Sequence, residues 1–357
     1  MSAAEGDPRK IWLKQAREGA VLLPTRHYGL LRVRGKDRAE FLHSYTTQDI
    51  KRLRPGQGCT SAISNWRGTV TDFVRVLARR DDLLILGTPG RQDVVRRALQ
   101  QYIIGVDVAL DDWSATLVAV EIAGPQALHI LPAARDLAVD AFRVVQFAPP
   151  LLDLPETENP VAEPPEPDEA PGTDDESSVT SGLVVRTEGL CGGGVLVVVP
   201  HAAEHALRER LRRLGATAVG DDVRDLLRIA EGIPEFGRDI GEDTNVWEAR
   251  LDRSVSLDKG CYLGQEIVAR LHNYQKVQRF LVGLRIEGGA APAAGTPVED
   301  AAGAVVGNVT SAADDGGGGV VALAMMRAGA AVAGTPVRVE GRIGAVADFL
   351  YWSKQPV

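Results

Sequence analysis

Two stretches of the chain repeat one strand-and-helix pattern, on either side of a proline-rich acidic segment. In residues 28–45 an alternating apolar run is followed by Gly35 and then by a predicted helix. In residues 117–131 an apolar run is followed by Gly124, and Pro125 stands at the start of a predicted helix, where its missing N–H costs nothing. The parallel predicts two copies of one folding unit.

The repeat continues further along each half. Residues 83–105 and 195–216 each have the pattern of a buried strand, a short turn and a helix with apolar residues at helical spacing. Asp37 and Glu40 have the spacing of a capping box at the start of the first helix. Each half is therefore predicted to be an α+β unit of ferredoxin-like type.

The C-terminal part of the chain has a different texture, with short β-rich runs separated by turns of Gly, Pro and Asp. Close and even spacing of this kind predicts a small antiparallel barrel or sandwich. The expected division is an N-terminal extension at 1–20, a first unit at 21–115, a second unit at 116–275 and a C-terminal β unit at 276–357.

The segment between the two halves is acidic and rich in proline. Residues 149–181 hold eight prolines, and residues 153–176 hold ten Asp or Glu and no Lys or Arg. Such a segment buries little apolar surface to offset the entropy of ordering, so a disordered insertion is expected, either a linker without function or a segment that recruits a protein partner. Without it, the formal charge of -8 becomes +2, from 40 basic against 38 acidic residues, which gives no sign of direct nucleic-acid binding.

The same composition excludes several classes of protein. No apolar run approaches the roughly 18 residues that a membrane helix needs, and the N-terminus lacks the pattern of a secretory signal, so a cytoplasmic protein with no membrane partner is expected. Cys59, Cys191 and Cys261 are too widely spaced for a disulfide framework or a zinc ribbon. His201 and His205 lie four apart on a predicted helix that is basic and exposed, and no metal site is predicted.

Cys261 is the first candidate for chemistry. It follows Lys259 by two residues and precedes a predicted helix that starts near Gly264, and both features favour a reactive thiolate. Asp258 and Glu266 oppose that effect. The glycine at 260 would let the backbone approach a ligand closely. A small buried core cysteine is the alternative interpretation.

Charged residues supply two further candidates. Asp72 interrupts an apolar alternation after Gly68, and it either caps a turn or faces a cleft and pairs with an amine of a ligand. Arg228 and Arg238 lie in the charged, glycine-interrupted stretch 227–255, where they could bind a carboxylate with two hydrogen bonds or form surface ion pairs.

The string KGCYLGQE at 259–266 carries a family resemblance. Together with LRIAEGIPEFG at 227–237 and the stretch at 29–58, it resembles the YgfZ family of folate-binding proteins, which are relatives of the glycine-cleavage T-protein. The resemblance extends over nearly the whole chain apart from the acidic segment. VVGNVTSA at 305–312 is similar to the barrel of the wider T-protein superfamily.

The resemblance implies a fold and a role. The fold would be a three-lobed ring of two ferredoxin-like units and a β-barrel, around a channel that binds tetrahydrofolate. The role would be assembly or repair of iron–sulfur proteins, which indirectly supports tRNA methylthiolation, with iron–sulfur client proteins or assembly factors as partners and a monomeric state. The alternative is a folate-dependent aminomethyltransferase of T-protein type, a one-carbon transferase.

The resemblance also implies the site residues. In aminomethyltransferases an R-x-E-A-G element supplies a glutamate to the pterin, whereas this chain has Ala230 there and Glu231 one place later. Thr71 and Asp72 likewise stand where those enzymes carry paired aspartates. The expected catalytic residues are Cys261, Asp72 and Lys259, and the expected folate-binding residues are Arg228, Glu231, Gly260, Tyr262, Gln265, Glu266 and Arg270.

Overall fold

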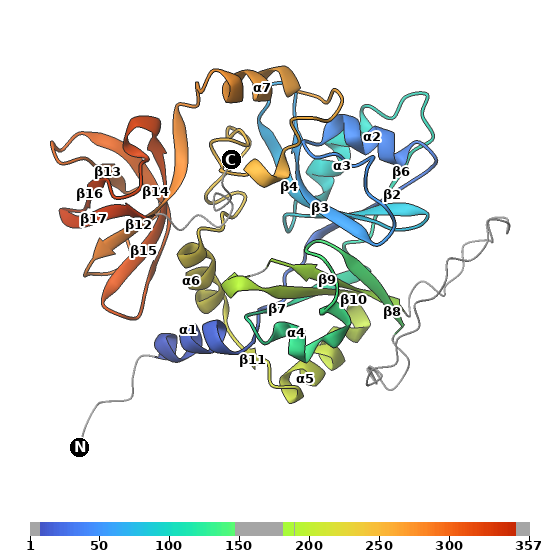
Figure 1. Cartoon of the computed structure of the whole chain (residues 1–357), viewed down its shortest axis with the longest axis horizontal. Helices are drawn as coiled ribbons and strands as arrows, with labels where there is room; N and C mark the ends of the chain where they lie inside the picture. Colours follow the sequence, from blue (N-terminus) through green and yellow to red (C-terminus); the bar gives the residue numbers. More distant parts are fainter. Residues whose placement is uncertain (1–7, 147–180, 189, 348–357) are drawn as a thin grey trace.

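The computed structural model describes residues 8–146, 181–188 and 190–347. Three lobes surround a common centre (Figure 1), and two of them are mixed α+β units while the third is a closed β-barrel. This arrangement confirms the predicted fold class. The acidic insertion expected at 149–181 lies outside the described residues, apart from Ser181, where a strand begins.

The first sheet has five antiparallel strands in the order β3-β4-β5-β2-β6. Its helices lie on one face, where apolar residues such as Leu42 and Val95 meet Leu31 and Ile85 of the strands. The elements are β2 (Gly29–Arg34), α2 (Arg38–Tyr45), β3 (Gln57–Ser64), β4 (Val70–Ala78), β5 (Asp82–Gly87), α3 (Gln92–Gln100) and β6 (Ala109–Asp112).

The second sheet has six strands in the order β11-β1-β7-β10-β9-β8. Its strands are β1 (Val21–Leu22), β7 (Leu117–Ala123), β8 (Phe142–Gln146), β9 (Ser181–Thr187), β10 (Gly194–Pro200) and β11 (Thr217–Ala218). Its helices are α1 (Pro8–Glu18), α4 (Ala127–Ile130), α5 (Glu204–Arg213) and α6 (Asp221–Glu231), with short 3₁₀ turns η1 (Pro132–Ala134), η3 (Leu190–Gly192) and η4 (His201–Ala203).

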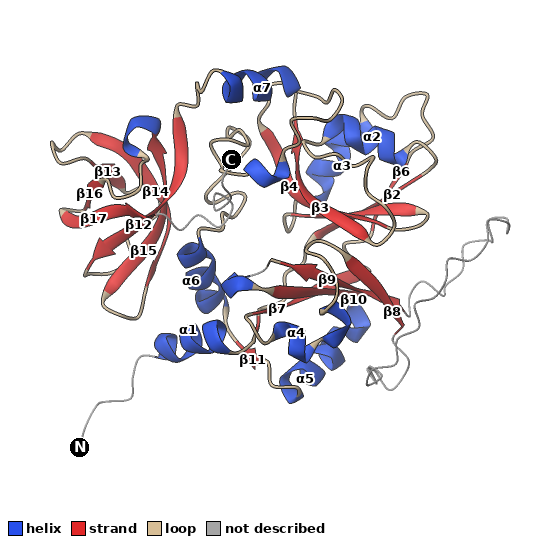
Figure 2. Cartoon of the chain, viewed as in Figure 1, coloured by secondary structure: helices blue, strands red, loops and turns tan. Residues whose placement is uncertain are grey.

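Strand β1 belongs to this second sheet, because it pairs with β7 and β11. The predicted division at 21–115 would assign those two residues to the first unit, so the chain begins on the second lobe and then crosses to the first. Figure 2 shows α4 and α5 on the side of the second sheet that faces away from the first sheet.

The two sheets face each other. Their contact is an apolar layer that includes Leu30 and Leu86 of the first sheet and Leu183 and Val198 of the second. The result is four layers, with helices outside and the two sheets inside.

The barrel closes in the order β12-β15-β14-β13-β16-β17. Its strands are β12 (Arg279–Glu287), β13 (Pro297–Glu299), β14 (Val305–Asp314), β15 (Gly319–Arg327), β16 (Pro336–Val339) and β17 (Arg342–Ala347), with η6 (Ala328–Ala330) between β15 and β16. The connection from the second lobe passes through η5 (Asp252–Ser254) and α7 (Gln265–Asn273). Of the two interpretations of this region, barrel or sandwich, the structure has the barrel.

Two local predictions have different outcomes. Helix α7 begins directly after Gly264, as the sequence predicts. The capping box at Asp37 and Glu40 is wrong, because the Asp37 side chain caps no helix N–H. Its carboxylate instead accepts a hydrogen bond from the backbone N–H of Asp107, 2.8 Å away, which links the helix start to the loop before β6.

Candidate functional site

A cavity of about 210 Å³ lies between the two sheets, beside the end of α6. The first sheet contributes Phe73 and Leu86, and the second contributes Glu121 and Leu196. The loop after α6 closes another side. Polar and charged lining residues include Arg26, Tyr28, Arg75, Asp140, Glu188, Arg224, Arg228 and Glu235. An apolar pocket with several convergent polar groups is the usual form of a small-molecule site.

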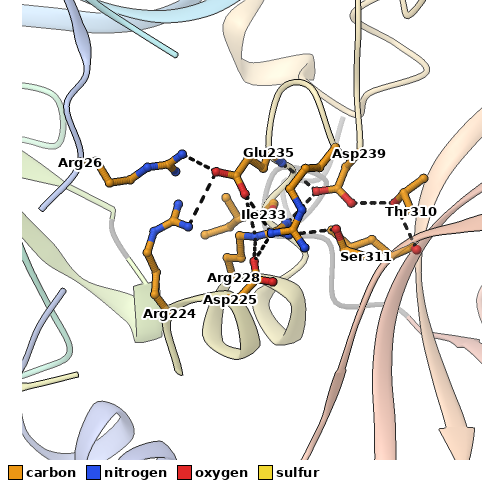
Figure 3. Close-up of polar contacts among 11 residues, drawn as sticks. Arg26, Arg224, Asp225, Arg228, Ile233, Glu235, Asp239, Thr310 and Ser311 are labelled. Carbon is orange, nitrogen blue, oxygen red and sulfur yellow. Dashed lines mark hydrogen bonds and ion pairs between the residues drawn. The ribbon is translucent and has the colours of Figure 1, made fainter. Parts of the chain in front are cut away.

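Glu235 is the centre of the charges around this cavity (Figure 3). Its carboxylate forms an ion pair with Arg26 and lies 3.8 Å from an N–H group of Arg224. Burial raises the pKa of Glu235, but the charges of Arg26, Arg224 and Arg228 outweigh burial and hold that pKa below its usual range. The carboxylate is therefore ionised at neutral pH.

Arg224 is the least satisfied cation of the cavity. Its side chain is 15% exposed, and its one ion pair among the described residues is the 3.8 Å contact with Glu235. Burial, and next the charge of Arg26, lower the pKa of its guanidinium. Because this guanidinium has one long ion pair, its N–H donors are available for an anionic group of a ligand.

Tyr28 and Glu121 are the open polar groups of the opposite wall. Within the described part of the chain, neither the Tyr28 hydroxyl nor the Glu121 carboxylate has a hydrogen-bond partner, although both line the cavity. Burial, and next the charge of Glu121, raise the pKa of Tyr28, so this hydroxyl stays protonated. The cavity thus offers a free carboxylate, a free hydroxyl and a cation.

Arg228 has most of its donors occupied by the protein. It is 1% exposed, and its guanidinium donates to Asp225 at 2.5 Å, to Asp239 at 2.6 Å and to the hydroxyl of Ser311 at 2.9 Å. Asp239 in turn accepts a 2.6 Å hydrogen bond from Thr310 of β14. Arg228 therefore joins α6 to the barrel beside the cavity, as Figure 3 shows.

Asp72 lies in β4, one layer behind the cavity wall. It is completely buried, and its carboxylate accepts hydrogen bonds from the backbone N–H and the hydroxyl of Thr88, at 3.0 and 2.6 Å, and from the N–H of Phe73. Burial raises its pKa. A Cβ on Gly87 would lie 2.7 Å from the carboxylate, so glycine is needed there. Asp72 reaches the cavity only through Gly87 and Thr88, which line it.

Lys259 is a buried cross-link to α2. Its ammonium donates to the carbonyls of His43, Thr46 and Gln48, at 2.5, 2.7 and 3.0 Å. It also lies 4.9 Å from the ring centre of Tyr262. Burial lowers the pKa of Lys259 to about 8. The lysine of the KGCYLGQE string thus satisfies carbonyls at the end of a helix that is more than 200 residues earlier in the chain.

Cys261 is exposed, so the core-cysteine alternative is wrong. The thiol is not part of the cavity lining, and the structure does not bring it together with Arg228 there. Gly260 is exposed beside it, whereas Tyr262 is 8% exposed and burial raises its pKa to about 12. The loop 259–266 is therefore held by its buried residues, while the thiol of Cys261 is exposed to solvent.

The other four predicted site residues lie outside the cavity and have different partners from one another. The Gln265 side chain accepts a hydrogen bond from the N–H of Tyr262 at 3.3 Å, which closes the loop. Glu266 and Arg270 form an exposed ion pair along α7. Glu231 is the last residue of α6, and its charge acts on Cys191, whose pKa burial raises to about 12. None of these four residues lines the cavity.

Sequence reasoning missed Tyr28, Glu121 and Arg224. A signal was present for Glu121, because it is the one charged residue in the apolar strand Leu117–Ala123. Tyr28 and Arg224 carry no such signal. Tyr28 directly precedes β2 and Arg224 lies on α6, and these two elements come together only in the folded chain. No group of three His, Cys, Asp or Glu in the described ranges is placed to hold a metal ion.

The sequence is similar to one protein family and to several aminomethyltransferases. Residues 13–151 match the family of the GCVT N-terminal domain. Aminomethyltransferases of Herpetosiphon aurantiacus and Koribacter versatilis are 27% and 28% identical, over 91% and 83% of this chain and 84% and 73% of theirs. These similarities support the GcvT-like superfamily. They do not distinguish the YgfZ family within it.

One further relative and one solved structure are also similar to this chain. A protein of Arabidopsis thaliana with the name "Putative transferase, chloroplastic" is 28% identical over 82% of this chain. The match spans 62% of the Arabidopsis protein, less than two thirds of its length. The crystal structure of the glycine cleavage system aminomethyltransferase T from Bartonella henselae superposes with a TM-score of 0.77, at 21% identity, over 97% of this chain and 90% of that one, and so shares the fold.

No helix within the described ranges has the length and apolar character needed to cross a membrane.

Proposed function

We propose that the cavity between the two sheets binds the pterin end of tetrahydrofolate. The observation that carries the proposal is the combination of an open carboxylate, an open hydroxyl and an under-paired guanidinium in one apolar pocket. A pterin is a flat ring whose edge carries N–H groups, which can donate to a carboxylate such as Glu121, and a carbonyl oxygen, which can accept from a guanidinium such as Arg224.

The size of the cavity limits the proposal to part of the ligand. At about 210 Å³ the cavity is smaller than the roughly 300–1,000 Å³ of pockets that enclose a drug-sized molecule. The ring system therefore occupies the cavity, and the tail extends toward its mouth. Calorimetric titration of tetrahydrofolate into the full chain tests binding, and absence of any heat of binding would contradict the proposal.

The proposed role of the folate-bound protein is assembly or repair of iron–sulfur proteins, with Cys261 as the functional thiol. The support is the KGCYLGQE string and its geometry, in which Lys259 and Gln265 fix the loop while the thiol stays exposed. A Cys261→Ser variant should fail to restore iron–sulfur enzyme activity in a deletion strain. Restoration equal to that by the wild type would remove the thiol from the proposal, without affecting folate binding.

Aminomethyl transfer to tetrahydrofolate is the second candidate. It is favoured by the aminomethyltransferases among the relatives and by the position of Asp72 directly behind two cavity residues. In this candidate Asp72 positions the cavity wall where the folate amine accepts the carbon unit. Incubation with an aminomethyl donor and tetrahydrofolate would then produce methylene-tetrahydrofolate. Absence of this product from a folded preparation that binds folate would argue for the first candidate.

A further inference from the structure

We propose that the cavity has a second polar subsite, formed by Arg75 and Thr187, which binds a neutral carbonyl oxygen of the ligand, such as an amide oxygen. The inference rests on the proposed binding of tetrahydrofolate, and it deepens that function by naming what the protein recognises beyond the pterin ring. Both residues line the cavity, together with Asp140 and Glu188.

Thr187 is a buried residue whose hydroxyl has no partner within the described part of the chain. It is the last residue of β9 and is 5% exposed, and its Oγ1 atom accepts and donates no hydrogen bond there. Val185, two residues earlier, belongs to the apolar layer between the sheets, so Thr187 lies on the same face of β9 and is directed at the cavity that it lines. A buried hydroxyl without a partner lowers stability, and a valine would fill the same space without that cost.

Arg75 lines the same end of the cavity from the opposite sheet. It pairs with Leu86 in the register of β4 and β5, and Leu86 belongs to the apolar layer, so the Arg75 side chain also lies between the sheets. Its guanidinium is 3.3 Å from the carboxylate of Asp140, whose backbone N–H donates to the carbonyl of Arg186 in β9, 2.8 Å away. These contacts hold the guanidinium beside the residue that precedes Thr187. The Nε–H of Arg75 is buried and has no hydrogen-bond partner in the described ranges.

The subsite is separate from the carboxylate that is proposed to bind the pterin edge. Glu121 pairs with Leu196, which pairs with Val185 in the next strand. Thr187 follows Val185 by two residues. Two strand spacings and two residues of rise therefore separate Glu121 from Thr187 by roughly 12 Å along the sheet. This span is longer than two fused rings, so a pterin bound at Glu121 leaves the subsite to the next part of the ligand.

The chemistry of this end of the cavity favours a neutral acceptor. The Nε–H of Arg75 can only donate, and the Thr187 hydroxyl can also donate, so the group that satisfies both is an acceptor oxygen. Arg75 is paired with Asp140. Glu188 is paired with Arg253, at 2.6 Å. A ligand carboxylate would meet two carboxylates whose cations are already paired, whereas a carbonyl oxygen accepts both hydrogen bonds without that repulsion. In tetrahydrofolate, the amide carbonyl between the benzoyl ring and the glutamate tail is such an oxygen.

The stability of Thr187→Val tests whether the hydroxyl is open. This variant keeps the shape of the side chain, and thermal unfolding without ligand should find it at least as stable as the wild type, since the hydroxyl has no partner to lose. Thr60→Val provides the contrast. Thr60 also lines the cavity, but its hydroxyl shares a 3.0 Å hydrogen bond with Ser254, so this variant should have a lower Tm. A similar loss in both variants would overturn the proposal, because Thr187 would then have a partner in the protein.

Calorimetric titration with tetrahydrofolate and with tetrahydropteroate tests which oxygen the subsite binds. Tetrahydropteroate has a carboxylate in place of the amide and lacks the glutamate tail, and the missing tail affects every variant alike. We expect Thr187→Val to weaken tetrahydrofolate binding about fivefold and to change tetrahydropteroate binding less than about twofold. Arg75→Lys keeps a cation for Asp140 but loses the Nε–H donor, and it should act in the same direction. Thr217→Val, on β11 of the same sheet and outside the cavity lining, is the matched control and should bind both ligands as the wild type does.

Equal effects of Thr187→Val on the two ligands would overturn the preference for a carbonyl. No effect on either ligand would overturn the subsite itself and assign the two donors to an ordered water. If the wild type binds no tetrahydrofolate, the proposed function fails, and benzamide and benzoate then test the subsite without a pterin. Saturation-transfer NMR with the full chain should show binding of benzamide that exceeds binding of benzoate and is weakened in Thr187→Val. Absence of benzamide binding would overturn the subsite, so the two failures are distinguishable.

Discussion

The ammonium group of Lys259 donates a hydrogen bond to the backbone carbonyl of His43, 2.5 Å away. This contact joins residues 216 positions apart in the chain, and the carbonyls of Thr46 and Gln48 complete the coordination. The helix α2 ends at Tyr45, so the lysine satisfies backbone acceptors at a helix end. The conspicuous lysine of the KGCYLGQE string is thus a structural element that sets the position of the thiol.

The first prediction concerns this cross-link. Lys259→Met should lower the free energy of unfolding by about 3 kcal/mol, because three carbonyls lose their shared donor inside the protein. Lys51→Met is the matched control, since the ion pair of Lys51 with Glu40 is half-exposed, and it should cost less than about 1 kcal/mol. Urea unfolding measures both, and equal losses would show that the three hydrogen bonds contribute nothing.

The second prediction is a pH dependence. Burial lowers the pKa of Lys259 to about 8, from the usual 10.5. Between those values the unfolded chain binds more protons than the folded chain, so the contribution of this group to the free energy of unfolding rises with pH. The difference between wild type and Lys259→Met should widen from pH 8 to pH 10, by on the order of 2 kcal/mol. A difference that narrows would mean that the carbonyls hold the ammonium more strongly than burial disfavours it.

The third prediction compares two arginines that contact the same carboxylates, Asp225 and Glu235. Arg228 is 1% exposed and also binds Asp239, whereas the side chain of Arg238 is 47% exposed. Arg228→Met should cost about 3–5 kcal/mol, because it leaves a buried carboxylate without its cation. Arg238→Met should cost less than about 1 kcal/mol. Thermal unfolding of the two variants provides the comparison, and similar losses would contradict a special role of Arg228 between α6 and the barrel.

The fourth prediction concerns Asp72. In the wild type, both carboxylate oxygens of Asp72 accept hydrogen bonds from Thr88 or Phe73. In Asp72→Asn an NH₂ group replaces one of these oxygens, so that this group and the former donor to that oxygen are two donors facing each other. We expect a loss of about 1–3 kcal/mol in the free energy of unfolding. Asp81→Asn, an exposed residue at the turn before β5, should be neutral. If Asp72→Asn were as stable as the wild type, the Asp72 carboxylate would not stabilise the fold. Any loss of activity in this variant would then be due to a role of the carboxylate in the reaction.

Much of the fold could be predicted because it depends on local patterns. Alternating strands, helical apolar spacing and the start of α7 after Gly264 are all local, and the structure has them where they were expected. Strand β1 could not be assigned in this way, since a two-residue strand has no periodicity and its partners are far along the chain. The capping box failed because Asp37 found a tertiary partner in Asp107.

The site was harder to predict than the fold. Motif residues such as Cys261 and Lys259 were recognisable, but their roles depend on contacts with the α2 end that no spacing reveals. Arg228 was singled out as a ligand-binding group, and the structure has it bound to Asp239 and Ser311. The residues that line the cavity come from both sheets, from α6 and from the loop after it, and only folding brings these distant parts of the chain together.

The central claim is that the cavity between the sheets is the folate site. The most direct measurement is calorimetric titration of tetrahydrofolate into wild type, Glu121→Gln and Arg224→Met, with Glu209→Gln and Arg212→Met as controls from an exposed ion pair on α5. Thermal unfolding without ligand verifies that each variant is folded. We predict that each cavity variant weakens binding about tenfold or more, which corresponds to about 1.4 kcal/mol, while the controls bind as the wild type does. Unchanged affinity in both Glu121→Gln and Arg224→Met would contradict the claim.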